Sequence, residues 1–213
     1  MLCLTPNLIP GNTGWQRDLL LSHNKIGDIQ VDQGDLSAAL KSYRASFAVA
    51  ERLVKADPGN ADWQLDLAVS RGKLGDMQIA DRDLSAALTS YRYAFAIFDR
   101  LAKTDPGNAG WQRDLSLSHQ KIGDVQVAQG DLPAALKSYR TSLAIAEHLA
   151  KTEHGNAMWQ RDLIVNYVKL SDVTGDKMYA MEALTIALAM QKRGILAPRD
   201  GWMIENLRQR AGQ

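Results

Sequence analysis

The sequence repeats one phrase at a fixed spacing, and this spacing constrains the fold more than any other feature. Tryptophan recurs every 48 residues, at Trp15, Trp63, Trp111 and Trp159. The stretch that begins at Trp111, WQRDLSLSHQKIGDVQVAQGDLPAALKSYR, nearly repeats the stretch that begins at Trp15. An enzyme needs one active site, whereas a stack of structural units repeats the same residues in each unit. We therefore predict an array of repeated units.

Each unit contains two helical patterns joined by a short turn. In the first unit, an apolar or small residue recurs at steps of four and three, which is typical of one face of an α-helix. These residues are Trp15, Leu19, Ser22, Ile26 and Ile29. Gly34 and Asp35 predict the end of this helix and the cap of the next. The second stripe comprises Leu36, Ala39, Leu40, Tyr43, Phe47, Ala50 and Leu53, and the turn signal Asp57-Pro58-Gly59 follows it. Two helices of similar length with a short turn predict an antiparallel hairpin.

Two small-residue signals recur in the units. Asparagine precedes each first helix, at Asn12, Asn60, Asn108 and Asn156, where its side chain is expected to cap the helix. Glycine lies inside the first helix of three units, at Gly27, Gly75 and Gly123. Glycine in a helix interior costs about 1 kcal/mol relative to alanine, so we expect the two helix backbones to approach closely there.

The predicted fold is an all-α, right-handed α-solenoid of about nine helices in one continuous domain. Residues 1–11 form a tail, the units span 12–59, 60–107 and 108–155, and a modified fourth unit spans 156–193. Residues 194–213 predict a C-terminal capping helix, in which Asp200 caps and Trp202, Met203 and Leu207 face inward. No comparable cap precedes the first unit, so its outer stripe is expected to be exposed or covered by another segment.

The segment KIGDIQVDQGDLSAALKSY resembles a tetratricopeptide repeat. The hallmark positions of that family match Ile26, Gly27, Gly34, Ala39, Tyr43 and Pro58, then Leu74, Gly75, Ala87, Tyr91 and Pro106, then Ile122, Gly123, Gly130, Ala135 and Tyr139. The resemblance covers about residues 12–192. The family's unit has 34 residues, so the longer unit is similar to the long-helix variety in kinesin light chains and bacterial repeat proteins. Arg82 replaces the turn glycine of the second unit, and Gln30, Gln78 and Gln126 replace the usual aromatic residue.

Composition argues against several classes of function. The chain has 25 Lys and Arg against 24 Asp and Glu, so it lacks the basic excess of a nucleic-acid-binding protein. Cys3 is the single cysteine, so neither an intrachain disulfide nor a thiolate metal cluster can form. We find no signal peptide and no apolar run of about 20 residues that would span a bilayer, and we predict a cytoplasmic protein that does not bind membranes. The histidines include no pair at i and i+4, and we predict neither a metal site nor a cofactor.

The phrase DLSLSH contains Asp114, Ser118 and His119, which are the ingredients of a hydrolase triad. Ser118 and His119 are adjacent on one helix, so their side chains point about 100° apart. The equivalent residues in other units are Ser70-Arg71 and Asn166-Tyr167. We therefore predict that the chain is not an enzyme.

The resemblance also implies a binding surface, because the first helices of tetratricopeptide repeats line a concave groove that binds peptides. The groove positions transfer to Arg17, Leu21, Asn24, Asp28 and Val31 in the first unit, and to Leu65, Val69, Gly72, Asp76 and Ile79 in the second. In the third unit they are Arg113, Leu117, Gln120, Asp124 and Val127, and in the fourth they are Arg161, Val165, Val168 and Asp172. The resemblance implies a scaffold that binds a peptide or partner protein in this groove. Leu21 and Asp28 stand where carboxylate-binding members carry lysine or asparagine, so a C-terminal carboxylate is not the expected ligand.

Two alternatives remain open at this point. A lysine lies three residues before each aspartate of the row, at Lys25, Lys73, Lys121 and Lys169, so the aspartates either bind a ligand or pair locally with these lysines. The second function hypothesis is self-association or a structural module, in which the open N-terminal face docks onto another copy or onto the rest of a larger signalling protein.

Overall fold

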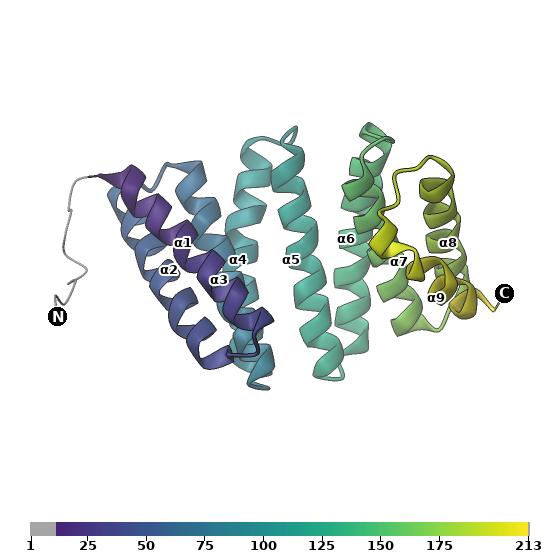
Figure 1. The fold of residues 1–213 in the computed structure, drawn as a ribbon, viewed down its shortest axis with the longest axis horizontal. Coiled ribbons are helices and arrows are strands. Elements are labelled where there is room, and N and C mark those ends of the chain that lie inside the picture. Colours follow the sequence, from purple (N-terminus) through teal and green to yellow (C-terminus); the bar gives the residue numbers. More distant parts are fainter. Residues whose placement is uncertain (1–11, 213) are drawn as a thin grey trace. The chain divides into compact units, whose positions relative to one another are not determined.

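The computed structural model describes residues 12–212, which form nine α-helices and one short 3₁₀ helix without any strand (Figure 1). The helices are α1 (Thr13–Asp32), α2 (Leu36–Ala56), α3 (Ala61–Ala80), α4 (Leu84–Thr104), α5 (Ala109–Ala128), α6 (Leu132–Thr152), α7 (Ala157–Thr174), α8 (Lys177–Lys192), η1 (Pro198–Asp200) and α9 (Trp202–Ala211). These helices confirm the predicted all-α solenoid class. The chain divides into two compact units within α4, unit 1 up to residue 97 and unit 2 from residue 98. The predicted tail of residues 1–11 lies outside the described residues.

Side-chain caps begin the helices at the predicted residues. The side-chain oxygens of Asn12, Asn60 and Asn108 each accept a hydrogen bond of 3.1 Å from the backbone N–H of the following tryptophan. Asp35 caps α2 in the same way, through the backbone N–H of Ala38. Each cap satisfies a backbone donor that has no partner inside the helix.

The turns between paired helices use a left-handed residue. Gly34 and Gly130 have φ values of 79° and 81°, and Arg82, which replaces the glycine of the second turn, has a φ of 61°. The Cβ atom of any residue other than glycine is sterically unfavourable in this region. The second turn is therefore strained relative to the other two.

The helix-interior glycines pack against tyrosine rings. A Cβ atom built at Gly27 would lie 2.5 Å from Cε1 of Tyr43, and one built at Gly123 would lie equally close to Cε1 of Tyr139. The prediction of close approach is correct, but its partner is an aromatic side chain of the second helix rather than the helix backbone. Glycine is required because the ring occupies the space of a Cβ atom.

Consecutive hairpins pack through the second helix of one and the first helix of the next. In unit 1, Ala39 and Tyr43 of α2 form a buried cluster with Leu74 and Met77 of α3. In unit 2, Ala135 and Tyr139 of α6 pack against Leu170 of α7 in the same register. The core therefore lies between neighbouring helices within each unit, as expected of a repeat array.

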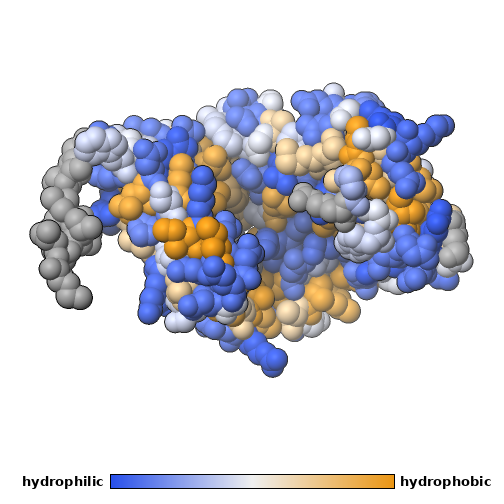
Figure 2. Space-filling view, viewed as in Figure 1, coloured by the Kyte–Doolittle hydropathy of each residue, from blue (hydrophilic) through white to orange (hydrophobic). Residues whose placement is uncertain are grey.

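The predicted stripe of α1 faces away from its partner helix and is exposed. Trp15 is 58% exposed, Leu19 48%, Ile26 46% and Ile29 55%, whereas α1 buries Leu20, Asn24 and Gly27 against its neighbours. Figure 2 shows hydrophobic side chains gathered over α1. The corresponding residues of α7, Trp159, Leu163 and Leu170, are buried. In α7 the equivalent stripe thus packs against the preceding hairpin. The described residues include no hairpin before α1, so its stripe is exposed.

The C-terminal cap differs from the prediction at two residues. Met203 and Leu207 are buried as expected, but Trp202 is 65% exposed. Asp200 lies in η1, and no side-chain hydrogen bond caps α9. The inward stripe of α9 is Met203, Ile204, Leu207 and Ala211. Trp202 lies off this stripe, because a helix of this length buries only one face.

Candidate protein-interaction surface

We name α1, α3, α5 and α7 the A helices. The groove positions that the sequence analysis predicts on these four helices are named the A face. On α3 this row is accessible, because Val69 is 37% exposed and Ile79 is 36% exposed. Between them, a Cβ atom built at Gly72 would meet no heavy atom within 4 Å. The A face of α3 therefore carries two exposed aliphatic side chains, Val69 and Ile79, which we name the aliphatic row, with an open position between them and Asp76 half-buried beside it.

In unit 1, ion pairs join the A-face residues Arg17 and Asp28 of α1 to α3 at two points. The Nε atom of Arg17 donates to Asp66 Oδ2 at 2.7 Å, and Arg17 also contacts the more exposed Asp62 at 3.4 Å. Further along the helices, Lys73 Nζ lies 2.5 Å from Asp28 Oδ1. The same carboxylate oxygen accepts a hydrogen bond of 2.6 Å from the hydroxyl of Tyr43.

Unit 2 repeats this arrangement between α5 and α7. Arg113 donates to both carboxylate oxygens of Asp162, at 2.5 and 3.3 Å. Asp124 Oδ1 accepts from Lys169 Nζ at 2.6 Å and from the hydroxyl of Tyr139 at 2.6 Å. Each arginine–aspartate and lysine–aspartate contact thus links one A helix to the next within its unit, and we name these contacts the inter-helix ion pairs.

The local pairing considered for the aspartate row is wrong where the structure gives the partner. Asp28 pairs with Lys73, which lies 45 residues later, and Asp124 pairs with Lys169 at the same separation. Both lysines also lie over the tyrosine ring of the shared contact, 5.6 Å from Tyr43 and 5.7 Å from Tyr139. The constant offset in the sequence is the signal that could have identified these pairs.

The pKa values follow from these contacts. Burial alone would raise the pKa of Asp28, but the hydrogen bonds from Lys73 and Tyr43 outweigh it and lower this pKa. Burial and the hydrogen bond to Asp28 together raise the pKa of the Tyr43 hydroxyl, and Tyr139 responds in the same way beside Asp124. The hydrogen bond to Asp66 raises the pKa of Arg17 against the opposing effect of burial. These groups are held in fixed charge states at neutral pH.

The last two charged residues of the A face bind the C-terminal segment. Arg161 Nη2 lies 3.2 Å from Asp200 Oδ1, and Arg210 of α9 forms an ion pair with Asp172. Asp76 accepts a hydrogen bond of 2.6 Å from the hydroxyl of Tyr91. All aspartates of the predicted row therefore have protein partners.

The uncharged residues of the A face differ in depth. Leu21 is 40% exposed, while Leu117 and Val165 are half-buried. Asn24 and Gln120 are buried, and Asn24 Oδ1 and Gln120 Nε2 have no hydrogen-bond partner in the described part of the chain. The exposed part of the A face thus combines aliphatic side chains with the charged side chains of the inter-helix ion pairs, and a buried amide lies on α1 and on α5.

Three glutamines of the A helices bind serines. Gln30, Gln78 and Gln126 each accept a hydrogen bond through Oε1 from the serine hydroxyl twelve residues later, at 2.7, 2.6 and 2.7 Å. The sequence did not indicate these partners. The glutamine–serine contacts tie the two helices of each hairpin together beside the turn.

The serines of the DLSLSH phrase bind the protein itself, since Ser116 contacts Ser142 of α6 and Ser118 contacts its own helix. The hydroxyl of Ser118 donates to the backbone carbonyl of Leu115 at 2.7 Å. Burial raises the pKa of Asp114 to about 6 against the opposing effect of Arg113, and burial lowers the pKa of His119 against the opposing effect of Asp99.

Across residues 12–212, no cluster of three histidine, cysteine or acidic side chains is arranged to hold a metal ion. Within that same range, no helix has the length and apolar character to cross a bilayer.

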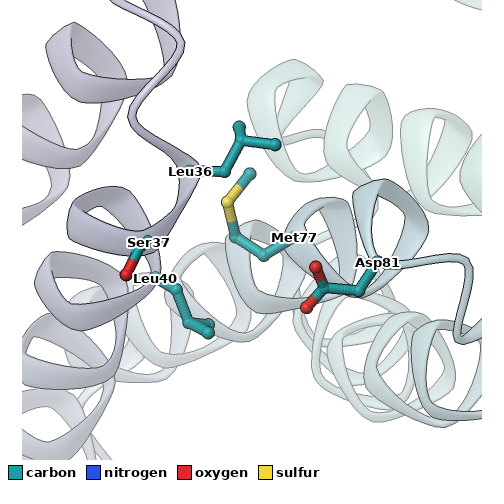
Figure 3. A pocket seen from close by; sticks show the side chains of 5 residues that line it. All are labelled: Leu36, Ser37, Leu40, Met77 and Asp81. Carbon is teal, nitrogen blue, oxygen red and sulfur yellow. The ribbon is translucent and has the colours of Figure 1, made fainter.

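A cleft of about 270 Å³ opens between the start of α2 and the end of α3, in unit 1. In Figure 3, Met77 extends toward Leu36, and Leu40, Ser37 and Asp81 line the remaining wall. This lining is mostly apolar, so the cleft suits an apolar side chain better than a charged group.

Comparisons with known proteins report similarity to solved helical structures. No protein-family model matches the sequence, and no curated protein matches it. The crystal structure of MamA protein is 17% identical, covers 85% of this chain and 100% of its own, and has a TM-score of 0.36. The apo form of RapI is 13% identical, with coverages of 89% and 82% and a TM-score of 0.46. A thermophilic TPR protein of Thermus thermophilus, TTC0263, is 18% identical, with coverages of 79% and 99% and a TM-score of 0.22.

The fold is tetratricopeptide-like. The hairpins of the chain itself carry this conclusion, because the hallmark small and large positions make the contacts that define the packing. Gly27 receives the ring of Tyr43 within a hairpin, and the buried Ala39 packs toward the next A helix. The tetratricopeptide-like fold leaves the A face as the accessible side of α3.

Proposed function

We propose that the chain is a protein-interaction scaffold that binds a peptide or a partner protein on the A face. The observation that carries this proposal is the aliphatic row on α3, where Val69 and Ile79 are exposed on either side of the open position at Gly72. Exposed apolar side chains that share one helix face provide the desolvated contacts that dominate protein binding.

The inter-helix ion pairs support this role by holding the A helices in a fixed arrangement. The contacts of Arg17 with Asp66 and of Lys73 with Asp28 join α1 and α3 at two separate points. A surface that is rigid before binding loses less conformational entropy on association, so its affinity is higher for the same contacts. The arginines and aspartates therefore position the surface, and the aliphatic residues supply its binding energy.

Variants of the aspartate row do not test binding on the A face alone. Replacement of Asp76 and Asp124 by lysine would remove acceptors of the Tyr91 and Tyr139 hydroxyls, so it would destabilise the fold as well as change the surface. Val69→Glu combined with Ile79→Glu changes only exposed aliphatic positions. Thr89→Glu combined with Ala96→Glu on α4 is the matched control, because both residues are also exposed.

The test is affinity capture with the intact chain, the Val69→Glu/Ile79→Glu variant and the control variant, followed by titration of each captured protein after purification. We expect partners of the A face to bind the wild type and the control, and to lose at least tenfold in affinity for the A-face variant. Two buried apolar contacts of this size account for such a loss. The proposal fails if purified partners bind the A-face variant as tightly as the wild type.

A further inference from the structure

The outward stripe of α1 is a second surface, separate from the A face. It comprises Trp15, Leu19, Ser22, Ile26 and Ile29, and its large apolar members are 46–58% exposed. In the same register, Leu74 and Met77 of α3 are covered by Ala39 and Tyr43 of α2. Leu170 of α7 is covered in the same way by Tyr139 of α6. The stripe therefore matches the second helix of a hairpin of this chain's own type.

The opposite end of the chain shows what occupies the complementary surface. In unit 2, Ala183, Ala187 and Met190 of α8 are buried beneath Met203, Ile204 and Leu207 of α9. These three α8 residues stand at the positions of Ala39, Tyr43 and Ser46 in the first repeat, which are the residues that cover a following A helix. Thus α9 occupies the place of the next A helix.

Charged contacts extend this equivalence. Arg17 and Arg113 each bind an aspartate of the following A helix, and the equivalent Arg161 binds Asp200. Asp28 and Asp124 each bind a lysine of the following A helix, and the equivalent Asp172 binds Arg210. The segment that contains η1 and α9 thus reproduces both inter-helix ion pairs of an internal repeat.

Helix α1 carries the same pair of charges. Asp66 and Lys73 of α3, and Asp162 and Lys169 of α7, are seven positions apart in the sequence. Asp18 and Lys25 of α1 have the same spacing and register, and both are exposed. The apolar stripe and these two charges together make α1 complementary to the α7–α8 hairpin.

We propose that α1 of one molecule docks onto the α7–α8 hairpin of a second copy in place of α9, so that the chain associates head to tail and α9 gates this association. Asp18 then binds Arg161 of the other copy and Lys25 binds its Asp172. The interface is heterologous, so each added molecule presents a new α7–α8 end. Because α9 is tethered to its site, it competes at a high effective concentration and keeps the wild-type chain largely unassembled. This inference does not depend on the A-face proposal. Arg161 and Asp172 belong to the A face, but the apolar contacts of the docking come from the α1 stripe and from α8, and its test uses different variants.

The test weakens α9 in the full-length chain and follows mass by sedimentation velocity and light scattering. Arg210→Glu places two like charges at the contact with Asp172 and loosens α9 without changing the apolar core. We expect the concentration at which the average mass rises to fall at least tenfold relative to the wild type. Adding Lys25→Glu should return this variant to the monomer mass, whereas adding Lys41→Glu, at an exposed position on α2, should not.

A charge exchange separates specific docking from general loss of the cap. Asp172→Lys alone repels both Arg210 and an incoming Lys25, so it should loosen α9 without assembly. Lys25→Glu combined with Asp172→Lys restores attraction between copies while Arg210 is still repelled, so this double variant should assemble. Circular dichroism confirms that each variant is folded.

Three outcomes would overturn the proposal. One is that Arg210→Glu and the double variant both remain monomeric over the accessible concentration range. Another is assembly of Arg210→Glu that survives Lys25→Glu unchanged, because this would show nonspecific association of the uncovered α8 surface. The third is a gain of mass only when another protein is added, which would assign the α1 stripe to that protein.

Discussion

At the residue scale, a glycine and a tyrosine determine how closely the two helices of a hairpin pack. The contact recurs in unit 1 at Gly75, where a Cβ atom would lie 2.7 Å from Cε1 of Tyr91. The ring is also oriented by its hydroxyl, which donates to Asp76. Glycine therefore lowers the intrinsic stability of the helix but permits the aromatic contact that joins the hairpin.

Helix α3 contains two interior glycines that separate these effects. Gly72→Ala should stabilise the chain by about 1 kcal/mol, because alanine is the better helix former and its Cβ would meet open space. Gly75→Ala should destabilise it by about 1–3 kcal/mol, because the overpacking against Tyr91 exceeds the gain in helix propensity. Urea denaturation of both variants measures the two free energies of unfolding. Equal shifts would contradict the role of the ring contact.

Asp114 is a residue whose charge opposes folding. Its pKa rises to about 6 through burial, above the value of about 3.9 for an unfolded chain. The folded state therefore binds the proton more tightly, so the contribution of Asp114 to stability is complete below about pH 4 and is lost as the pH rises through 6. Asp114→Asn should stabilise the chain by about 1 kcal/mol at pH 7, allowing for solvent screening, and should have little effect at pH 4.

Asp162 provides the matched control for this pH dependence, since it occupies the same register one repeat later and binds Arg113. Asp162→Asn removes a charge-assisted contact and should destabilise the chain at pH 7. Denaturation midpoints of both variants at pH 4 and pH 7 test the prediction. A destabilising effect of Asp114→Asn at pH 7 would show that its carboxylate is favoured by the fold.

At the element scale, each hairpin depends on a short turn that reverses the chain within a few residues. Asp35 and Asp131 cap the second helices of two hairpins through backbone N–H groups, and Asp83 does the same after the Arg82 turn. The three turns therefore share their cap chemistry and differ at the left-handed position. Arg82 is the residue that departs from the pattern.

Arg82→Gly should increase the free energy of unfolding by about 1 kcal/mol, because the φ of 61° costs arginine more than glycine. The reciprocal change, Gly130→Arg, should destabilise the equivalent turn by about 1–2 kcal/mol, since Gly130 has a φ of 81°. Thermal and chemical denaturation of both variants check this pair of predictions. A neutral result for both would show that these turns relax without strain.

At the scale of the whole molecule, helices that follow one another in the sequence pack together within each unit. In unit 2, α6 packs with α7, α7 with α8, and α8 with α9. In unit 1, α1 packs with α2 but leaves its outward stripe exposed. The stability of such an array is approximately a sum of unit and interface terms, so an uncovered end helix is expected to open first.

Native-state hydrogen exchange tests this difference at matched positions. Ile26 of α1 is 46% exposed, whereas Leu170, three repeats later on α7, is fully buried. At low protein concentration we expect backbone amides around Ile26 to exchange at least tenfold faster than those around Leu170, because less buried surface opposes local opening. Equal protection would show that the outward stripe does not limit the stability of α1.

The sequence by itself determined the repeat length, the helix hairpins, their caps at Asn12, Asn60 and Asn108, and the left-handed turn positions. These features depend on helical periodicity and on backbone hydrogen bonds between residues a few positions apart, so local patterns report them. The same patterns also predicted the outward apolar stripe of the first unit, which the described residues leave exposed.

Only the tertiary structure decided which residues form ion pairs between helices and which end residues are exposed. Asp28 binds Lys73 rather than a local lysine, Asp200 binds Arg161 rather than capping a helix, and Trp202 is exposed. Each outcome depends on which helix packs against which face, so residues about 40 to 50 positions apart must be brought together before the contact exists. Local periodicity shows that a residue lies on a particular helix face, but packing decides whether that face meets another helix or water.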